Sequence, residues 1–357
     1  MRTFVPHAAA DAAPAGWGVR RAARLDFPEP AALAADPVHT GRLRVYLTDL
    51  LRPYGLALDE AALARGGQSY AEMGEALIAL AVPPGEAVDL LVLAYAVPDI
   101  APGRATTTRL SHVCPGAPMA FAVTDQSATA PFTALRLIRA YACAAGMSRA
   151  LLLIAEQPSV PYDAGLPRTL PLTSTALAFL LGPASPLPLT LPTALPARGG
   201  AGGVTPLPAR GRVGADTVLP ALGGADAATA LPAPGGVGGV TLPAPGGVAA
   251  PGALPAGGEV EAVGALIAAA PGPVTAILGP GLTPAAAPGA HRVRTADPGR
   301  PTTGVWWELA AEVAAVQDAP AATPPHLLVA DRDPSSGTLS LAVLTPALEP
   351  AMSGRHA

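Results

Sequence analysis

Three short runs of the chain are apolar at nearly every position instead of at alternate ones. Residues 88–97 read VDLLVLAYAV, residues 150–155 read ALLLIA, and residues 175–181 read TALAFLL. A strand with one solvated face alternates polar and apolar residues, whereas a strand covered on both faces is apolar throughout. These runs therefore predict buried strands of an α/β protein.

Helical spacing separates the predicted strands. Residues 70–80 place apolar side chains three and four apart and stop at Pro83 and Pro84, and residues 131–145 begin at a proline and stop at Gly146. A further strand is predicted at 119–123. Beyond residue 258 the same alternation predicts helices at 260–269 and 303–317, a strand at 274–278, and an antiparallel pair at 326–330 and 338–344.

A low-complexity segment divides these two series. Leu-Pro-Ala followed by a Gly-Gly pair recurs from Leu195, Leu219, Leu231, Leu242 and Leu254. Such Pro and Gly density cannot hold a helix or a regular ladder. The predicted organisation is thus an N-terminal extension with first elements (1–69), a first half (70–182), a flexible insert (183–258) and a second half (259–357).

Charge and cysteine content narrow the classes of function. The chain has a formal net charge of -4, no lysine and no dense basic run, which argues against nucleic acid and membrane surfaces as partners. Cys114 and Cys143 cannot supply a four-thiolate zinc site, and we expect neither a metal nor a cofactor. No stretch has the length and apolar character of a signal peptide or membrane span, so we expect a cytoplasmic protein with free thiols.

The order of elements from residue 70 to 181 resembles the ketosynthase III family of the thiolase-like superfamily. The match runs through a strand ending at Pro98-Asp99, the strand Ala120-Phe121-Ala122-Val123, a helix, and the strand at 150–155. Residues 259–345 look like the second half of the same duplication. The resemblance implies an α/β fold with αβαβα layers from two duplicated halves, interrupted by the insert.

The family's catalytic cysteine, at a helix N-terminus, has no counterpart in this sequence. Counting forward from Phe121 places that position at Ser127, and counting back from Gly146 places it at Thr129. Either hydroxyl is a candidate acyl carrier that Asp125 could orient or activate. A small polar residue that caps the helix is the alternative for both hydroxyls, and a charge that complements the helix dipole is the alternative for Asp125.

The family's histidine and asparagine are also missing. The histidine would follow the strand 274–278, where the chain has Gly279, and the nearest imidazole is His291. The asparagine position falls on Thr302 or Thr303. Trp306 and Trp307 follow on the next helix, so these four residues are candidates for lining a substrate site, with core packing as the alternative for the tryptophans.

His112 and Cys114 form a second candidate for chemistry. On an extended segment, residues two apart share a face, so this imidazole and thiol could form a reactive pair. A buried, unreactive thiol is the alternative interpretation.

The resemblance implies a protein that handles acyl thioesters in specialised metabolism of the polyketide or fatty-acid type. We expect either an acyltransferase that takes its acyl group from an acyl carrier protein or acyl-CoA, or a catalytically inert thiolase-fold partner of an active ketosynthase. A decayed gene product is a third interpretation. The family pairs strands across a two-fold axis, so a homodimer or a heterodimer with a ketosynthase is expected.

Overall fold

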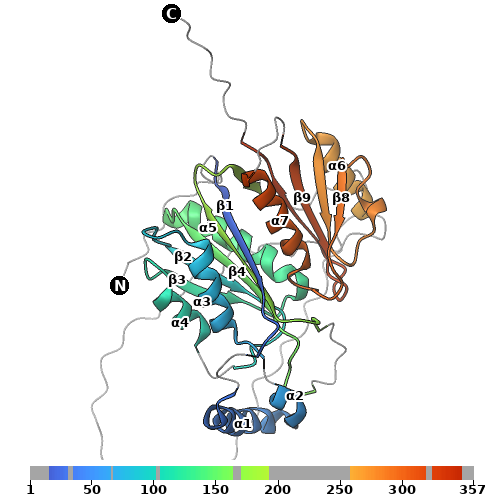
Figure 1. The fold of residues 1–357 in the computed structure, drawn as a ribbon. Coiled ribbons are helices and arrows are strands. Elements are labelled where there is room, and N and C mark those ends of the chain that lie inside the picture. The colour runs from blue at the N-terminus through green and yellow to red at the C-terminus, as the bar shows by residue number, and fades with distance from the viewer. Residues whose placement is uncertain are drawn as a thin grey trace, which may run out of the picture. The chain divides into compact units, whose positions relative to one another are not determined.

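The computed structural model describes residues 16–30, 35–65, 67–101, 105–163, 170–192, 258–318 and 324–347. Within them, strands join in the order β3-β2-β4-β5-β1-β6-β10-β9-β7-β8 (Figure 1). The strands are β1 Gly18–Asp26, β2 Leu90–Ala94, β3 Met119–Val123, β4 Ala150–Glu156, β5 Thr175–Gly182, β6 Leu187–Thr190, β7 Val274–Leu278, β8 Arg292–Thr295, β9 His326–Arg332 and β10 Leu339–Leu344. The predicted buried strands are confirmed as β2, β4 and β5.

The strand order shows that the fold is an internal duplication. In the first half, β2 is parallel to β3 and β4, and β5 lies antiparallel to both β4 and β1. In the second half, β7 is parallel to β8 and β9, and β10 lies antiparallel to both β9 and β6. The two halves therefore share one topology and meet where β1 pairs with β6.

Helices cover the sheets according to the same scheme. They are α1 Pro37–Leu51, α2 Glu60–Arg65, α3 Tyr70–Ala81, α4 Thr106–Val113, α5 Ala130–Ala145, α6 Gly258–Ala269 and α7 Gly304–Asp318. Helices α5 and α7 lie between the two halves of the sheet, α3 and α4 cover the outer face of the first half, and α6 lies across the second half from α7 (Figure 1). The predicted αβαβα layering from two duplicated halves is confirmed.

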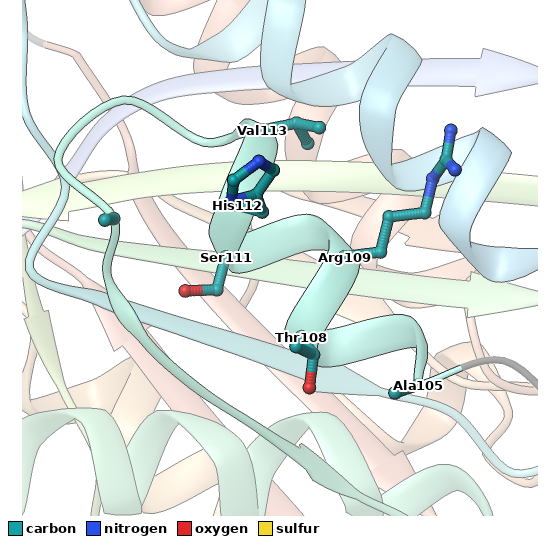
Figure 2. A pocket seen from close by; sticks show the side chains of 7 residues that line it. Ala105, Thr108, Arg109, Ser111, His112 and Val113 are labelled. Carbon is teal, nitrogen blue, oxygen red and sulfur yellow. The ribbon is translucent and has the colours of Figure 1, made fainter.

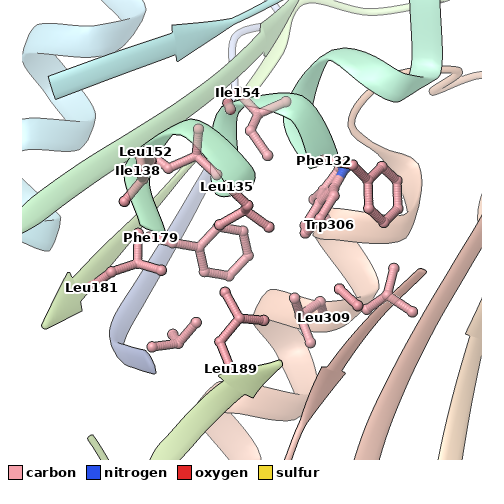
Figure 3. Close-up of a cluster of buried hydrophobic side chains, with 14 of the residues drawn as sticks. Phe132, Leu135, Ile138, Leu152, Ile154, Phe179, Leu181, Leu189, Trp306 and Leu309 are labelled. Atoms are coloured by element: carbon pink, nitrogen blue, oxygen red, sulfur yellow. The ribbon is translucent and has the colours of Figure 1, made fainter. Parts of the chain in front are cut away.

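Two hydrophobic clusters follow from the doubly apolar strands. Leu152 and Phe179 face the central helices, where Phe132 of α5 and Trp306 of α7 meet with ring centroids 4.7 Å apart (Figure 3). The neighbouring residues Leu151 and Leu180 point to the opposite face and pack under α3 and α4. Each strand thus contributes alternate side chains to two cores, which is why residues 90–94, 150–155 and 176–181 are apolar throughout.

Local signals set the ends of the main helices as expected. Ser69 and Glu72 form a capping box at the start of α3. Helix α5 has a proline in its first turn and ends at Gly146, which has the left-handed φ of 62° that terminates many helices. These ends agree with the predicted helices at 70–80 and 131–145.

Strand β6 corrects the predicted boundary of the insert. Residues 187–190 were expected to lie in a segment without a regular ladder, yet they pair with β1 and β10. Leu187 and Leu189 enter the central core, which offsets the poor strand propensity of the flanking prolines. The remaining insert, 193–257, lies outside the described residues.

The junction between the halves depends on a glycine. A Cβ atom on Gly18 would lie 2.1 Å from the carbonyl oxygen of Leu187, so only glycine permits this approach of β1 to β6.

Among the helices of the described ranges, we find none that combines the length and apolarity needed to span a bilayer.

Candidate functional site

The connection from β3 to α5 has an unusual backbone. Asp125 and Ser127 have positive φ values of 60° and 47°, a left-handed conformation that costs a non-glycine residue about 1–2 kcal/mol. Ser127 opens a short 3-10 turn, Ser127–Thr129, that leads directly into α5. Strain of this kind persists only where the surrounding structure enforces it, and it concentrates at functional sites.

The two candidate hydroxyls at this turn differ in their contacts. The Thr129 hydroxyl donates a hydrogen bond to the Gln126 carbonyl oxygen at 2.6 Å, so it stabilises the turn. Ser127 is half-buried, and its hydroxyl makes no hydrogen bond to any other residue that the structure describes. Of the two, Ser127 has the hydroxyl that is free to react.

Asp125 does not form the contact that activation would need. Its side chain is exposed, and within the described ranges no hydrogen bond joins its carboxylate to Ser127. The base for a hydroxyl nucleophile must come from elsewhere.

The predicted pairing of His112 with Cys114 is wrong. Residues 106–113 form helix α4 instead of an extended segment, so residues two apart do not share a face. His112 is exposed, whereas Cys114 is 3% exposed, and burial raises the pKa of its thiol to about 11. Such a thiol is almost wholly protonated at neutral pH and is a poor nucleophile.

An open groove runs along α4 (Figure 2). Its volume is about 860 Å³, and His112, Ser111 and Arg109 line it. Arg109 forms an ion pair with Glu75 of α3, so its charge is already compensated. The groove lies on the outer face, away from the turn before α5.

Thr302 and Thr303 are buried at the start of α7, where they bind a carboxylate that the sequence did not single out. Glu156, the last residue of β4, accepts the Thr302 N–H at 2.9 Å, the Thr303 N–H at 3.3 Å and the Thr303 hydroxyl. Burial raises the pKa of Glu156 to about 7 against the lowering effect of these hydrogen bonds and of Arg300. The two threonines therefore tie the halves together.

The two tryptophans lie in different environments. Trp306 is 1% exposed and packs between Phe132 and Phe179, so the core-packing alternative describes it (Figure 3). Trp307 is half-buried, and the guanidinium carbons of Arg24 and Arg300 lie 4.6 Å and 4.0 Å from its ring centroid.

A second buried carboxylate, Asp331, lies near the end of β9. It is 3% exposed, and one of its oxygens has no hydrogen-bond partner. Burial, together with the charge of Asp333, raises its pKa to about 7, although a backbone hydrogen bond from Arg332 lowers it. Strand β9 lies against the turn Ser127–Thr129.

Glu156 and Asp331 were not among the residues predicted from the sequence, although their positions carry a signal. Each is an acidic residue within the last two positions of a strand and directly follows a run of apolar residues, where burial of a charge needs a reason. The described ranges contain no group of three or more His, Cys, Asp or Glu residues that could hold a metal ion.

Comparison with known proteins returned solved structures only. No family model and no curated protein matches the chain. It is similar to AbyA1, a tetronic acid condensing enzyme, with 16% identity and a TM-score of 0.47 over 93% of this chain and 100% of that one. The acyltransferase ChlB3 gives 17% identity and 0.46 over 93% and 98%. A 3-oxoacyl-(acyl carrier protein) synthase III, FabH from Pseudomonas aeruginosa PAO1, gives 13% and 0.45 over 94% and 100%.

These identities and TM-scores are too low to assign the activity of any of those proteins to this chain. The assignment of fold rests on the chain's own topology, in which two halves with one strand order enclose a central pair of helices. The chain therefore has the thiolase-like αβαβα fold that the resemblance implied, with Ser127 in the turn before α5 and the buried Glu156 bound at the start of α7.

Proposed function

We propose that this protein is an acyltransferase that accepts an acyl group from an acyl thioester on the hydroxyl of Ser127. The observation that carries the proposal is the left-handed, half-buried turn that presents Ser127 at the start of α5. A helix N-terminus supplies free N–H groups and a partial positive charge, both of which stabilise the oxyanion of a tetrahedral intermediate.

The reaction is a simple exchange of esters. The Ser127 oxygen attacks the thioester carbonyl carbon and loses its proton, the carbon–sulfur bond breaks, and the thiol leaves with a proton. A second nucleophile, an alcohol or an amine, then takes the acyl group and regenerates the hydroxyl. Transfer of this kind needs no decarboxylation, so it does not require the family's asparagine.

The resemblance of residues 70–181 to ketosynthase III proteins supports acyl carrier protein or acyl-CoA as the donor, in metabolism of the polyketide or fatty-acid type. Incubation with a panel of both thioesters, followed by intact-protein mass spectrometry, tests this. A covalent acyl adduct that is lost in Ser127→Ala but kept in Thr129→Ala and Cys114→Ala is the expected result. An adduct that survives Ser127→Ala would reject Ser127 as the carrier.

Strand β3 supports an inert partner subunit as a second candidate function. Among the strands that the structure describes, β3 pairs with β2 alone and so forms an edge, and its residues Met119 and Ala122 are exposed. An uncovered edge is a template for pairing with another chain. Light scattering of the purified protein, alone and with an active ketosynthase, tests this: a heterodimer without any acyl adduct favours the inert subunit, and a homodimer with an adduct favours the enzyme.

A further inference from the structure

The internal duplication makes Glu156 and Asp331 counterparts. Ala94 pairs with Ile154 in the first half as Ile277 pairs with Val329 in the second, and all four of these residues lie in the central core. Glu156 lies two residues after Ile154, and Asp331 lies two residues after Val329. Because alternate residues of a strand share a face, both carboxylates point towards the layer of α5 and α7.

The two counterparts differ in how their charge is satisfied. Glu156, from the first half, receives three donors from the start of α7 in the second half. Asp331, from the second half, lies on the strand that contacts the turn before α5 in the first half. Its buried side chain keeps one oxygen without a partner. The fold thus supplies hydrogen-bond donors to the Glu156 carboxylate and leaves one oxygen of Asp331 without a donor.

Gly279 makes room for this carboxylate. A Cβ atom on Gly279 would lie 1.7 Å from Oδ1 and 2.3 Å from Cγ of Asp331, so no larger residue fits there while the aspartate keeps its position. The Gly279 N–H donates to the Ala330 carbonyl oxygen at 2.8 Å, which places the two residues side by side at the ends of β7 and β9. Gly279 is the first residue after β7, where the resemblance to the ketosynthase III family implies a histidine that this chain lacks.

A buried carboxylate oxygen without a partner is costly, because it has lost its water and gained no hydrogen bond in exchange, and among the described residues the Arg332 backbone N–H is the one donor to the Asp331 carboxylate. Such a group persists where it serves a reaction. Among the charged groups near it, Asp333 has its Oδ1 engaged by Ser335 and Ser336, and the Arg332 side chain is paired with Glu259. Neither of these side chains neutralises Asp331.

We propose that Asp331 is the general base for Ser127, a catalytic carboxylate that occupies the space left by Gly279. This inference rests on the proposed function of Ser127. Asp331 takes the Ser127 proton as the oxygen bonds to the thioester carbonyl carbon, and it gives that proton to the sulfur as the carbon–sulfur bond breaks. The products are the Ser127 ester and a free thiol. The pKa of about 7 that burial gives to Asp331 suits both transfers at neutral pH.

Acylation kinetics of Asp331→Asn against Asp333→Asn test the inference. The second variant makes the same chemical change two residues away, in a turn where asparagine can still accept the hydrogen bonds. We expect the rate of Ser127 acylation to fall by about 100-fold or more in Asp331→Asn, because general-base catalysis contributes about 10²–10⁴-fold. Asp333→Asn should stay within a few-fold of wild type.

Two further measurements separate a catalytic role from a structural one. Removing an unpaired buried charge should leave the melting temperature of Asp331→Asn unchanged or raised, and formate should restore acylation to Asp331→Ala by entering the vacated space. Wild-type acylation with no loss in Asp331→Asn would overturn this inference and leave the proposed function standing. No acylation of the wild type would overturn both the inference and the proposed function. Slower acylation of Asp331→Asn that matches a loss of folded protein, with no rescue of Asp331→Ala by formate, would overturn the inference alone.

Discussion

The buried carboxylate of Asp331 predicts how the stability of this protein depends on pH. Its folded pKa of about 7 lies above the ordinary value of 3.8 for an aspartate, so the folded state holds a proton that the unfolded state releases. The stability associated with that proton is fully present below the unfolded pKa and is lost as the pH rises through the folded pKa. Asp331→Asn cannot take up the proton and should not show this loss.

The magnitude follows from the two pKa values. Between pH 5 and the folded pKa, stability falls by about 1.4 kcal/mol per pH unit, which gives about 3 kcal/mol between pH 5 and pH 8. Urea unfolding at the two pH values, at one salt concentration, should show the wild type losing about that much more than Asp331→Asn. Asp333→Asn is the control, because it keeps the Asp331 carboxylate and should retain most of the dependence.

Parallel stability curves for the wild type and Asp331→Asn would refute this reasoning. They would show that Asp331 is ionised in the folded protein throughout this pH range and that its buried oxygen has found a partner. A steeper loss in Asp331→Asn than in the wild type would contradict the sign itself.

Three further predictions concern the surroundings of the site. Glu156→Ala should destabilise the protein by about 2–4 kcal/mol in urea unfolding, because two N–H groups and a hydroxyl lose their acceptor, and an unchanged midpoint would contradict this. Trp306→Ala should cost about 3–5 kcal/mol through the cavity it leaves, and Trp307→Ala clearly less, in the same assay. A thiol reagent should label half-buried Cys143 in the folded protein and buried Cys114 only on unfolding; equal rates for both would show that Cys114 is accessible.

Much of the candidate site was located from the sequence, because local signals carry it. The apolar strand 119–123 and the helix that ends at Gly146 bracket the turn with Ser127 and Thr129. Thr302 and Thr303 were placed at the start of the last long helix in the same way. The contacts of these residues were not predictable, since Glu156 is separated from Thr303 by the whole insert and by several elements of the second half.

The sequence by itself determined the elements whose two faces are both apolar and whose ends carry caps or breakers. Periodicity and end signals of this kind act within about a dozen residues, so β4, β5, α3 and α5 could be predicted from them. The tertiary structure alone decided the rest. The charged β1 and the proline-bearing β6 are strands because partners flank them, and Asp331 has a buried oxygen without a hydrogen-bond partner because the packing of the second half covers the end of β9.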